Sequence, residues 1–122
     1  RTAREEDHMP DQTSTATSAA VTGILADLPV TAKATTSRVV VNNPLLRVVY
    51  FSFDAGQELT AHTSPRAVVV TCLTGVIDFT VGSDVHRMTA GDVIYLAPNE
   101  RHALVAVEAA QMSLVMVETE PA

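Results

Sequence analysis

The sequence predicts an all-β protein with a short helix near its start. Short strand-like runs follow one another at regular intervals, and turn signals built from Gly, Pro, Asn and Asp separate them. Very little of the chain has the 3.6-residue periodicity of a helix. Many short strands with little helix are typical of a β-sandwich or a β-barrel.

The first 17 residues have the composition of a flexible tail. They are rich in Thr, Ser, Ala and charged residues and nearly free of large apolar ones, so they bury too little surface to offset the entropy of ordering. The pair His8-Met9 is similar to a common cloning junction. We therefore expect Met9 to be the native start and residues 1–8 to be a cloning remnant.

Residues 18–36 read as a short helix followed by a linker. Ser18 can cap the helix, and Pro29 would end it. The apolar side of this helix would carry Ala19, Ala20, Ile24, Leu25 and Leu28.

Residues 37–120 form the predicted β-domain. The expected strands are 37–41, 45–53, 58–62, 67–73, 76–81, 85–88, 93–96, 102–107 and 111–118. In 76–81, strand alternation turns Ile77, Phe79 and Val81 inward. Strands 45–53 and 67–73 are apolar at nearly every position, which favours a second covering on their outer faces. A second layer or a subunit interface would supply that covering, and we expect a homodimer.

Composition excludes several classes of partner. A net charge of -6 with eight scattered Lys and Arg residues argues against nucleic acid. No apolar run is long enough for a membrane span, and the start has no apolar core of a signal peptide. The single cysteine, Cys72, excludes an internal disulfide and fits a reducing compartment. We expect a cytoplasmic protein with no nucleic-acid or membrane partner.

Two motifs carry a family resemblance. The first, GQELTAHTSPRAVVVTCLTG, contains Gly56, His62 and Gly75, and the second, GDVIYLAPNERH, contains Gly91 and His102. Their spacing resembles that of the cupin superfamily, and the second motif is close to that of small single-domain bacterial cupins. The resemblance covers roughly residues 45–118. It implies a double-stranded β-helix, or jelly-roll barrel, around a pocket.

The resemblance also implies a divalent metal, but this sequence departs from the metal-binding motif. The family pattern has a second His and a Glu where this chain has Ser64 and Val68. His62 and His102 remain as possible ligands for Zn, Fe, Mn, Ni or Cu, fewer than the three or more that catalytic sites use. Regular alternation would place Glu58 on the face of His62 as a third candidate. The thiolate of Cys72 could also ligate, although a buried cysteine is more often a small hydrophobe.

Strand alternation predicts an apolar pocket with a few polar groups beside the two histidines. Such a pocket suits a small, largely apolar ligand oriented by hydrogen bonds. Met112 and Leu114 on the last strand share the inward face with part of this set, and Arg66 lies at the predicted mouth. The predicted lining is Arg47, Val49, Phe51, Phe53, His62, Ser64, Val70, Cys72, His102, Leu104 and Met116.

Three functions remain open from the sequence. The protein could bind a small molecule without chemistry. His62 and His102 could act as acid and base in an isomerase, cyclase or lyase that needs no metal, because imidazole titrates near neutral pH. An atypical two-histidine metal site could support an oxygenase-like enzyme. Fold alone does not select among them.

Overall fold

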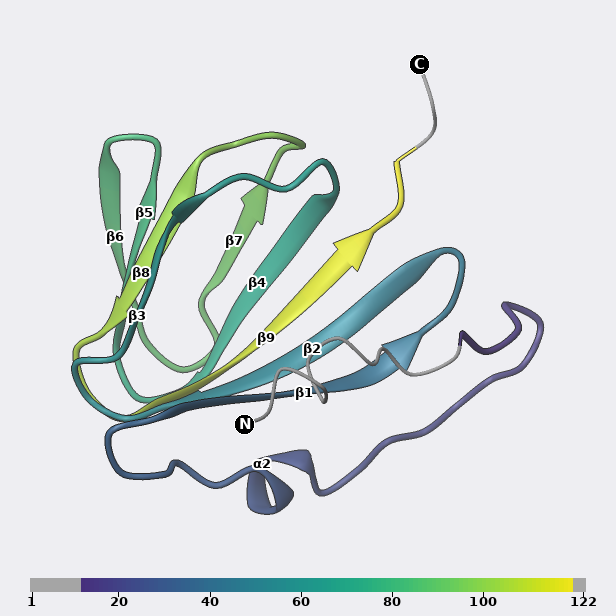
Figure 1. The fold of residues 1–122 in the computed structure, drawn as a ribbon, viewed down its shortest axis with the longest axis horizontal. Coiled ribbons are helices and arrows are strands. Elements are labelled where there is room, and N and C mark those ends of the chain that lie inside the picture. Colours follow the sequence, from purple (N-terminus) through teal and green to yellow (C-terminus); the bar gives the residue numbers. More distant parts are fainter. Residues whose placement is uncertain (1–11, 120–122) are drawn as a thin grey trace.

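Two antiparallel sheets make up the domain in the computed structural model, which describes residues 12–119. One sheet has five strands in the order β1-β2-β9-β4-β7, and the other has four in the order β3-β8-β5-β6. Figure 1 shows the two sheets splayed apart at the end where the chain leaves β9. The strands are β1 (Thr35–Asn42), β2 (Leu46–Phe53), β3 (Glu58–His62), β4 (Ala67–Thr74), β5 (Ile77–Val81), β6 (Asp84–Met88), β7 (Val93–Leu96), β8 (His102–Ala106) and β9 (Ala110–Val117).

All nine predicted strands are present, and the all-β jelly-roll class with one short helix is confirmed. Most predicted ends lie within one or two residues of the observed ones. On β5, Ile77 and Phe79 are buried and Val81 packs against the core, as alternation requires. Turn residues and period-2 patterning are local properties of the sequence, so they placed the strands well.

The helix is shorter than the sequence predicted. It is a single turn, α2 (Ile24–Asp27), and its N-cap is Gly23 rather than Ser18. Residues 18–23 contain Val, Thr and Gly, which are weak helix formers, and a short helix gains little beyond its nucleation cost. Of the predicted apolar side, Ile24 is buried while Leu25 stays exposed.

Side chains of the five-stranded sheet hold α2 in place. The Gln111 side-chain amide donates to the carbonyl oxygens of Leu25 and Leu28 at 3.0 and 3.1 Å. The Ser52 hydroxyl also donates to Leu28 O. These contacts dock α2 on the outer face of β2 and β9, at the end where Ser52 pairs with Gln111.

The predicted tail falls largely outside the described residues, and so do His8 and Met9. Within the described part, the backbone N–H of Thr13 donates to Asn42 O at 2.9 Å, which joins this segment to the end of β1. No helix in the described residues is both long enough and apolar enough to cross a bilayer.

The space between the sheets is a packed core. Its largest fully buried side chains include Phe53, Phe79, Ile77, Met88 and Met112. Phe51 and Phe53 stack with ring centroids 5.7 Å apart. A pocket lies beside this core, at the end of β3 and the start of β8.

Gly75 closes the other end of the domain. It adopts a positive φ of 77°, and a Cβ built there would overlap Ala109 O and the Cα of Ala110. Only glycine fits this position, because both the backbone conformation and the space exclude a side chain.

Candidate functional site

His62 and His102 come together because their strands are neighbours. β3 ends at His62, β8 begins at His102, and the two residues are directly paired across the sheet. The register of this pairing shifts between Leu59 and His62, which marks a β-bulge. The bulge lets Leu59 and His62, three residues apart, line the same pocket.

The two imidazoles lie against each other, and each makes the same kind of hydrogen bond to the backbone. Their ring centroids lie 4.3 Å apart, edge to face. The Nδ1 atom of His62 is 2.8 Å from Thr60 O, and the Nδ1 atom of His102 is 2.9 Å from Glu100 O. A carbonyl oxygen can only accept, so each Nδ1 carries the proton and each neutral ring keeps its lone pair on Nε2.

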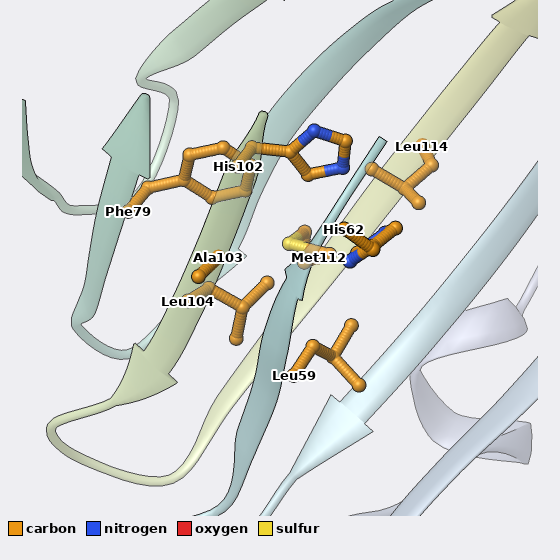
Figure 2. A pocket seen from close by; sticks show the side chains of 8 residues that line it. All are labelled: Leu59, His62, Phe79, His102, Ala103, Leu104, Met112 and Leu114. Atoms are coloured by element: carbon orange, nitrogen blue, oxygen red, sulfur yellow. The ribbon is translucent and has the colours of Figure 1, made fainter. Parts of the chain in front are cut away.

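A small apolar pocket surrounds these rings (Figure 2). Its volume is about 20 Å³, enough for roughly one water-sized group. The Phe79 ring stacks against His102 with centroids 5.9 Å apart. The lining consists of Leu59, His62, Phe79, His102, Ala103, Leu104, Met112 and Leu114.

His102 is the more enclosed of the two histidines. Burial lowers the pKa of His102, and the nearby His62 lowers it further, although the bond to Glu100 O acts in the opposite direction. His102 is therefore a neutral base at pH 7. Its Nε2 can accept a hydrogen bond or take a proton from a bound group.

The loops that follow β3 and precede β8 are tied together. Asn99 has a positive φ of 68° and donates its backbone N–H to Ser64 O at 2.7 Å. Asn tolerates this conformation better than most residues. The Ser64 hydroxyl accepts the Arg66 N–H at 3.2 Å within its own turn. Arg66, which we expected at the mouth, forms an ion pair with Glu118 at 3.0 Å.

Glu58 does not share the face of His62. The bulge after Leu59 reverses the alternation on which the expectation depended. Glu58 instead lines a shallow hollow of about 460 Å³ on the outer face of the four-stranded sheet, together with Asp78, Thr80 and Val85. It is therefore unable to complete a metal site with the two histidines.

Cys72 likewise does not line the pocket that holds the two histidines. It is fully buried in the core, where its thiol contacts the carbonyl oxygens of Thr74 and Met88. Burial raises the pKa of Cys72, and the Asp92 carboxylate raises it further, so the thiolate is disfavoured. Within residues 12–119, no group of three or more His, Cys, Asp or Glu side chains is arranged to hold a metal ion.

Only some of the residues that the sequence predicted as pocket lining do line the observed pocket. His62, His102 and Leu104 line it, as do Met112 and Leu114, which share the inward face of the last strand. Phe53, Val70 and Cys72 are fully buried in the core and Val49 is nearly so. Phe51 and Met116 pack against that core. Arg47 and Ser64 lie outside the lining, and Arg47 approaches Asn42 Oδ1 at 3.5 Å.

Sequence reasoning missed Leu59, Phe79 and Ala103 as pocket residues. Phe79 was correctly assigned to the inward face of its strand, and its position opposite Leu104 of β8 brings it near His102. Leu59 was missed because regular alternation assigned it to the face opposite His62. Only knowledge of the bulge could have found it.

Comparisons with known proteins agree with this architecture. The family model described as "Cupin domain" matches residues 49–118. A conserved protein of unknown function from Streptococcus pyogenes, SPY1581, is similar at 32% identity over 93% of this chain and 100% of its own, with a TM-score of 0.78.

Two more distant structures share the fold. A cupin superfamily protein from Desulfitobacterium hafniense is 16% identical, covering 78% of this chain and 88% of its own, with a TM-score of 0.74. An RmlC-like cupin from Shewanella frigidimarina is 21% identical, covering 70% and 78%, with a TM-score of 0.67. No curated protein matches the chain.

Proposed function

Because this chain belongs to the cupin family, we propose that it binds a small molecule whose polar head group enters the pocket between His62 and His102. The observation that carries this proposal is the matched pair of Nδ1 to carbonyl bonds, at 2.8 and 2.9 Å. They leave two Nε2 acceptors without a partner among the described residues. A ligand that donates hydrogen bonds would satisfy them.

The size of the pocket sets the form of the ligand. A volume of about 20 Å³ accepts a hydroxyl or amine group but not a ring. The rest of the molecule would lie at the open side, over Leu59 and Leu114, which are partly buried apolar side chains. We therefore infer a small, largely apolar ligand that carries a hydroxyl or N–H donor at one end.

Phenol and anisole make a matched pair of probes for this proposal. Phenol donates a hydrogen bond, whereas its methyl ether, anisole, has the same ring and cannot donate. We expect phenol to perturb the NMR signals of the His62 and His102 rings and to bind at least several-fold more tightly than anisole. The His102→Phe variant should lose this preference, and His86→Ala, at an exposed position on β6, should keep it. Equal binding of the two probes would contradict the proposal.

A metal ion is poorly supported by the residues present. Each Nδ1–H donates to a carbonyl oxygen, so each imidazole is in the tautomer whose Nε2 lone pair could bind a metal. However, a catalytic metal site normally takes three protein ligands, and the described residues supply two.

Titration calorimetry after chelator treatment tests the metal directly. Zn²⁺, Fe²⁺, Mn²⁺, Ni²⁺ and Cu²⁺ should each bind weakly, with dissociation constants well above one micromolar. Submicromolar binding of any of them that disappears in a His62→Ala, His102→Ala double variant would replace the small-molecule proposal by a metal site.

Acid–base chemistry on the bound molecule is the second candidate. It is favoured by the lowered pKa of His102, which keeps a free base beside a second imidazole at neutral pH. Acetone in D₂O is a suitable probe, because its methyl group is small enough for the pocket and removal of a methyl proton next to the carbonyl leads to deuterium incorporation. The intact protein should accelerate this exchange and His102→Phe should not. Exchange at the buffer rate would exclude this function for carbon acids of this size.

A further inference from the structure

Arg47 lies on the same wall as the pocket, one row further out. It is paired directly with Met116 of β9, and two residues along β2 Val49 is paired with Leu114, which lines the pocket. Residues paired across neighbouring strands share a face, and Met116 packs against the core. Arg47 therefore belongs to the inner face of the five-stranded sheet, with its Cα about 8 Å from that of Leu114.

This inner face opens to solvent on the side of β2. Toward β4 it stays closed, because Val68, the other neighbour of Met116, is 3% exposed. Met112 is fully buried deeper on β9, whereas Leu114 and Met116 are half-buried, as is Arg47. The wall thus changes from packed core to solvated rim in the direction of Arg47.

The two histidines lie at this same end of the domain. β3 ends at His62, the loop after it leads into β4 at Ala67, and Ala67 is paired with Val117 at the end of β9. Figure 1 shows the two sheets splayed apart at this end. The part of a ligand that extends from the histidines over Leu114 can therefore reach the rim at Arg47.

The guanidinium of Arg47 has no carboxylate partner in the described part of the chain. The one hydrogen bond that its side chain makes there runs from Nε to Asn42 Oδ1, at a long 3.5 Å. By contrast, Arg66 and Arg87 each form an ion pair with a carboxylate, at 3.0 and 2.8 Å. A guanidinium has five N–H donors, so most of those of Arg47 remain for an anion.

We propose that Arg47 binds a carboxylate at the far end of the ligand. The site would then take an amphipathic molecule with a hydroxyl or N–H donor at one end and a carboxylate at the other, an inference that rests on the proposed binding between His62 and His102. A guanidinium can bind a carboxylate through two parallel hydrogen bonds. The net charge of -6 disfavours anions in general, so a preference for a carboxylate would be a local property of Arg47.

The probes para-hydroxyphenylpropionate and para-hydroxyphenylpropionamide test Arg47, because they have the same shape and differ in charge at one end. By titration calorimetry at neutral pH, the carboxylate should bind about tenfold more tightly than the amide. Arg47→Gln should lose this preference, and Arg47→Lys, which keeps the charge without the planar fork, should retain a smaller one. The matched control is Arg38→Gln, which removes the same charge from an exposed position on the outer face of β1 and should leave the preference unchanged.

A second readout needs no variant at this position. In the intact protein, the NMR signal of the Arg47 Nε–H group should shift on addition of the carboxylate and not of the amide. Equal binding of the two probes, an unshifted Nε–H signal, or equal effects of Arg47→Gln and Arg38→Gln would overturn the inference. Failure of the histidine proposal is distinguishable, because it appears as equal binding of phenol and anisole, which are both uncharged.

Discussion

Gly75 occupies the position where a side chain is least tolerated. An added Cβ would meet the backbone of Ala109 and Ala110, which has no freedom to rotate away, and the φ of 77° is itself unfavourable for other residues. Gly75→Ala should therefore lower the free energy of unfolding by about 3 kcal/mol or more.

The control for that substitution is Gly56→Ala. Gly56 also has a positive φ, of 87°, but a Cβ there has nothing within 4 Å. It should lose only about 1 kcal/mol from backbone strain. Urea unfolding monitored by circular dichroism measures both variants. Equal losses of unfolding free energy in the two variants would show that the positive φ, and not the overlap with Ala109 and Ala110, causes the loss at Gly75.

His102 makes stability depend on pH. Its pKa is lower in the folded protein than in the unfolded chain because burial disfavours the charged ring. The unfolded chain therefore binds the proton first as the pH falls. The stabilising contribution is fully present above about pH 6.5, the ordinary value for histidine, and is lost as the pH falls through the lower folded pKa.

The resulting prediction compares two variants by urea unfolding at pH 7.5 and pH 5. The loss of stability on acidification should be smaller in His102→Gln than in the intact protein. His86→Gln should behave like the intact protein, because His86 is exposed. A pH dependence unaltered by His102→Gln would mean that other groups cause it.

At the scale of elements, contacts with the five-stranded sheet stabilise α2. A single helical turn is not stable alone, so the Gln111 and Ser52 contacts should control its population. Gln111→Glu keeps the shape of the side chain but removes the N–H donors. We expect trypsin to cleave after Lys33 several-fold faster in this variant, with a loss of about 1 kcal/mol in stability. Unchanged cleavage would show that the burial of Ile24 is sufficient to hold α2.

The elements also show what the sequence could and could not predict. Strand bounds follow from alternation and turn residues, so they were predicted closely. The bulge in β3 arises from pairing with β8, and nothing within residues 58–62 signals it. For that reason His62 and His102 were predicted together correctly, while Glu58 was assigned to the wrong side. The pocket was overestimated because alternation tells which way a side chain faces but not how closely the opposite sheet approaches it, as the complete burial of Phe53 and Val70 shows.

The whole molecule carries a net charge of -6, and this charge determines how any association of two copies should respond to salt. If two copies meet through an apolar contact, salt screens the repulsion between two chains of charge -6 without weakening the contact itself. The dimer dissociation constant should therefore fall severalfold between 10 and 200 mM NaCl, measured by sedimentation equilibrium. A dimer that weakens with salt would instead depend on ion pairs.

The bond from Asn99 N–H to Ser64 O joins the loop that follows His62 to the loop that precedes His102. A ligand that bridges His62 and His102 would hold the end of β3 and the start of β8 together, and with them the two loops that this bond joins. The Asn99 amide is therefore an internal reporter of ligand binding: its hydrogen exchange should slow when phenol is bound between the histidines, while the Gly56 amide, bonded to Ala106 O, should be unaffected. Equal slowing at both amides would indicate stabilisation of the whole domain in place of a local effect at the two histidines.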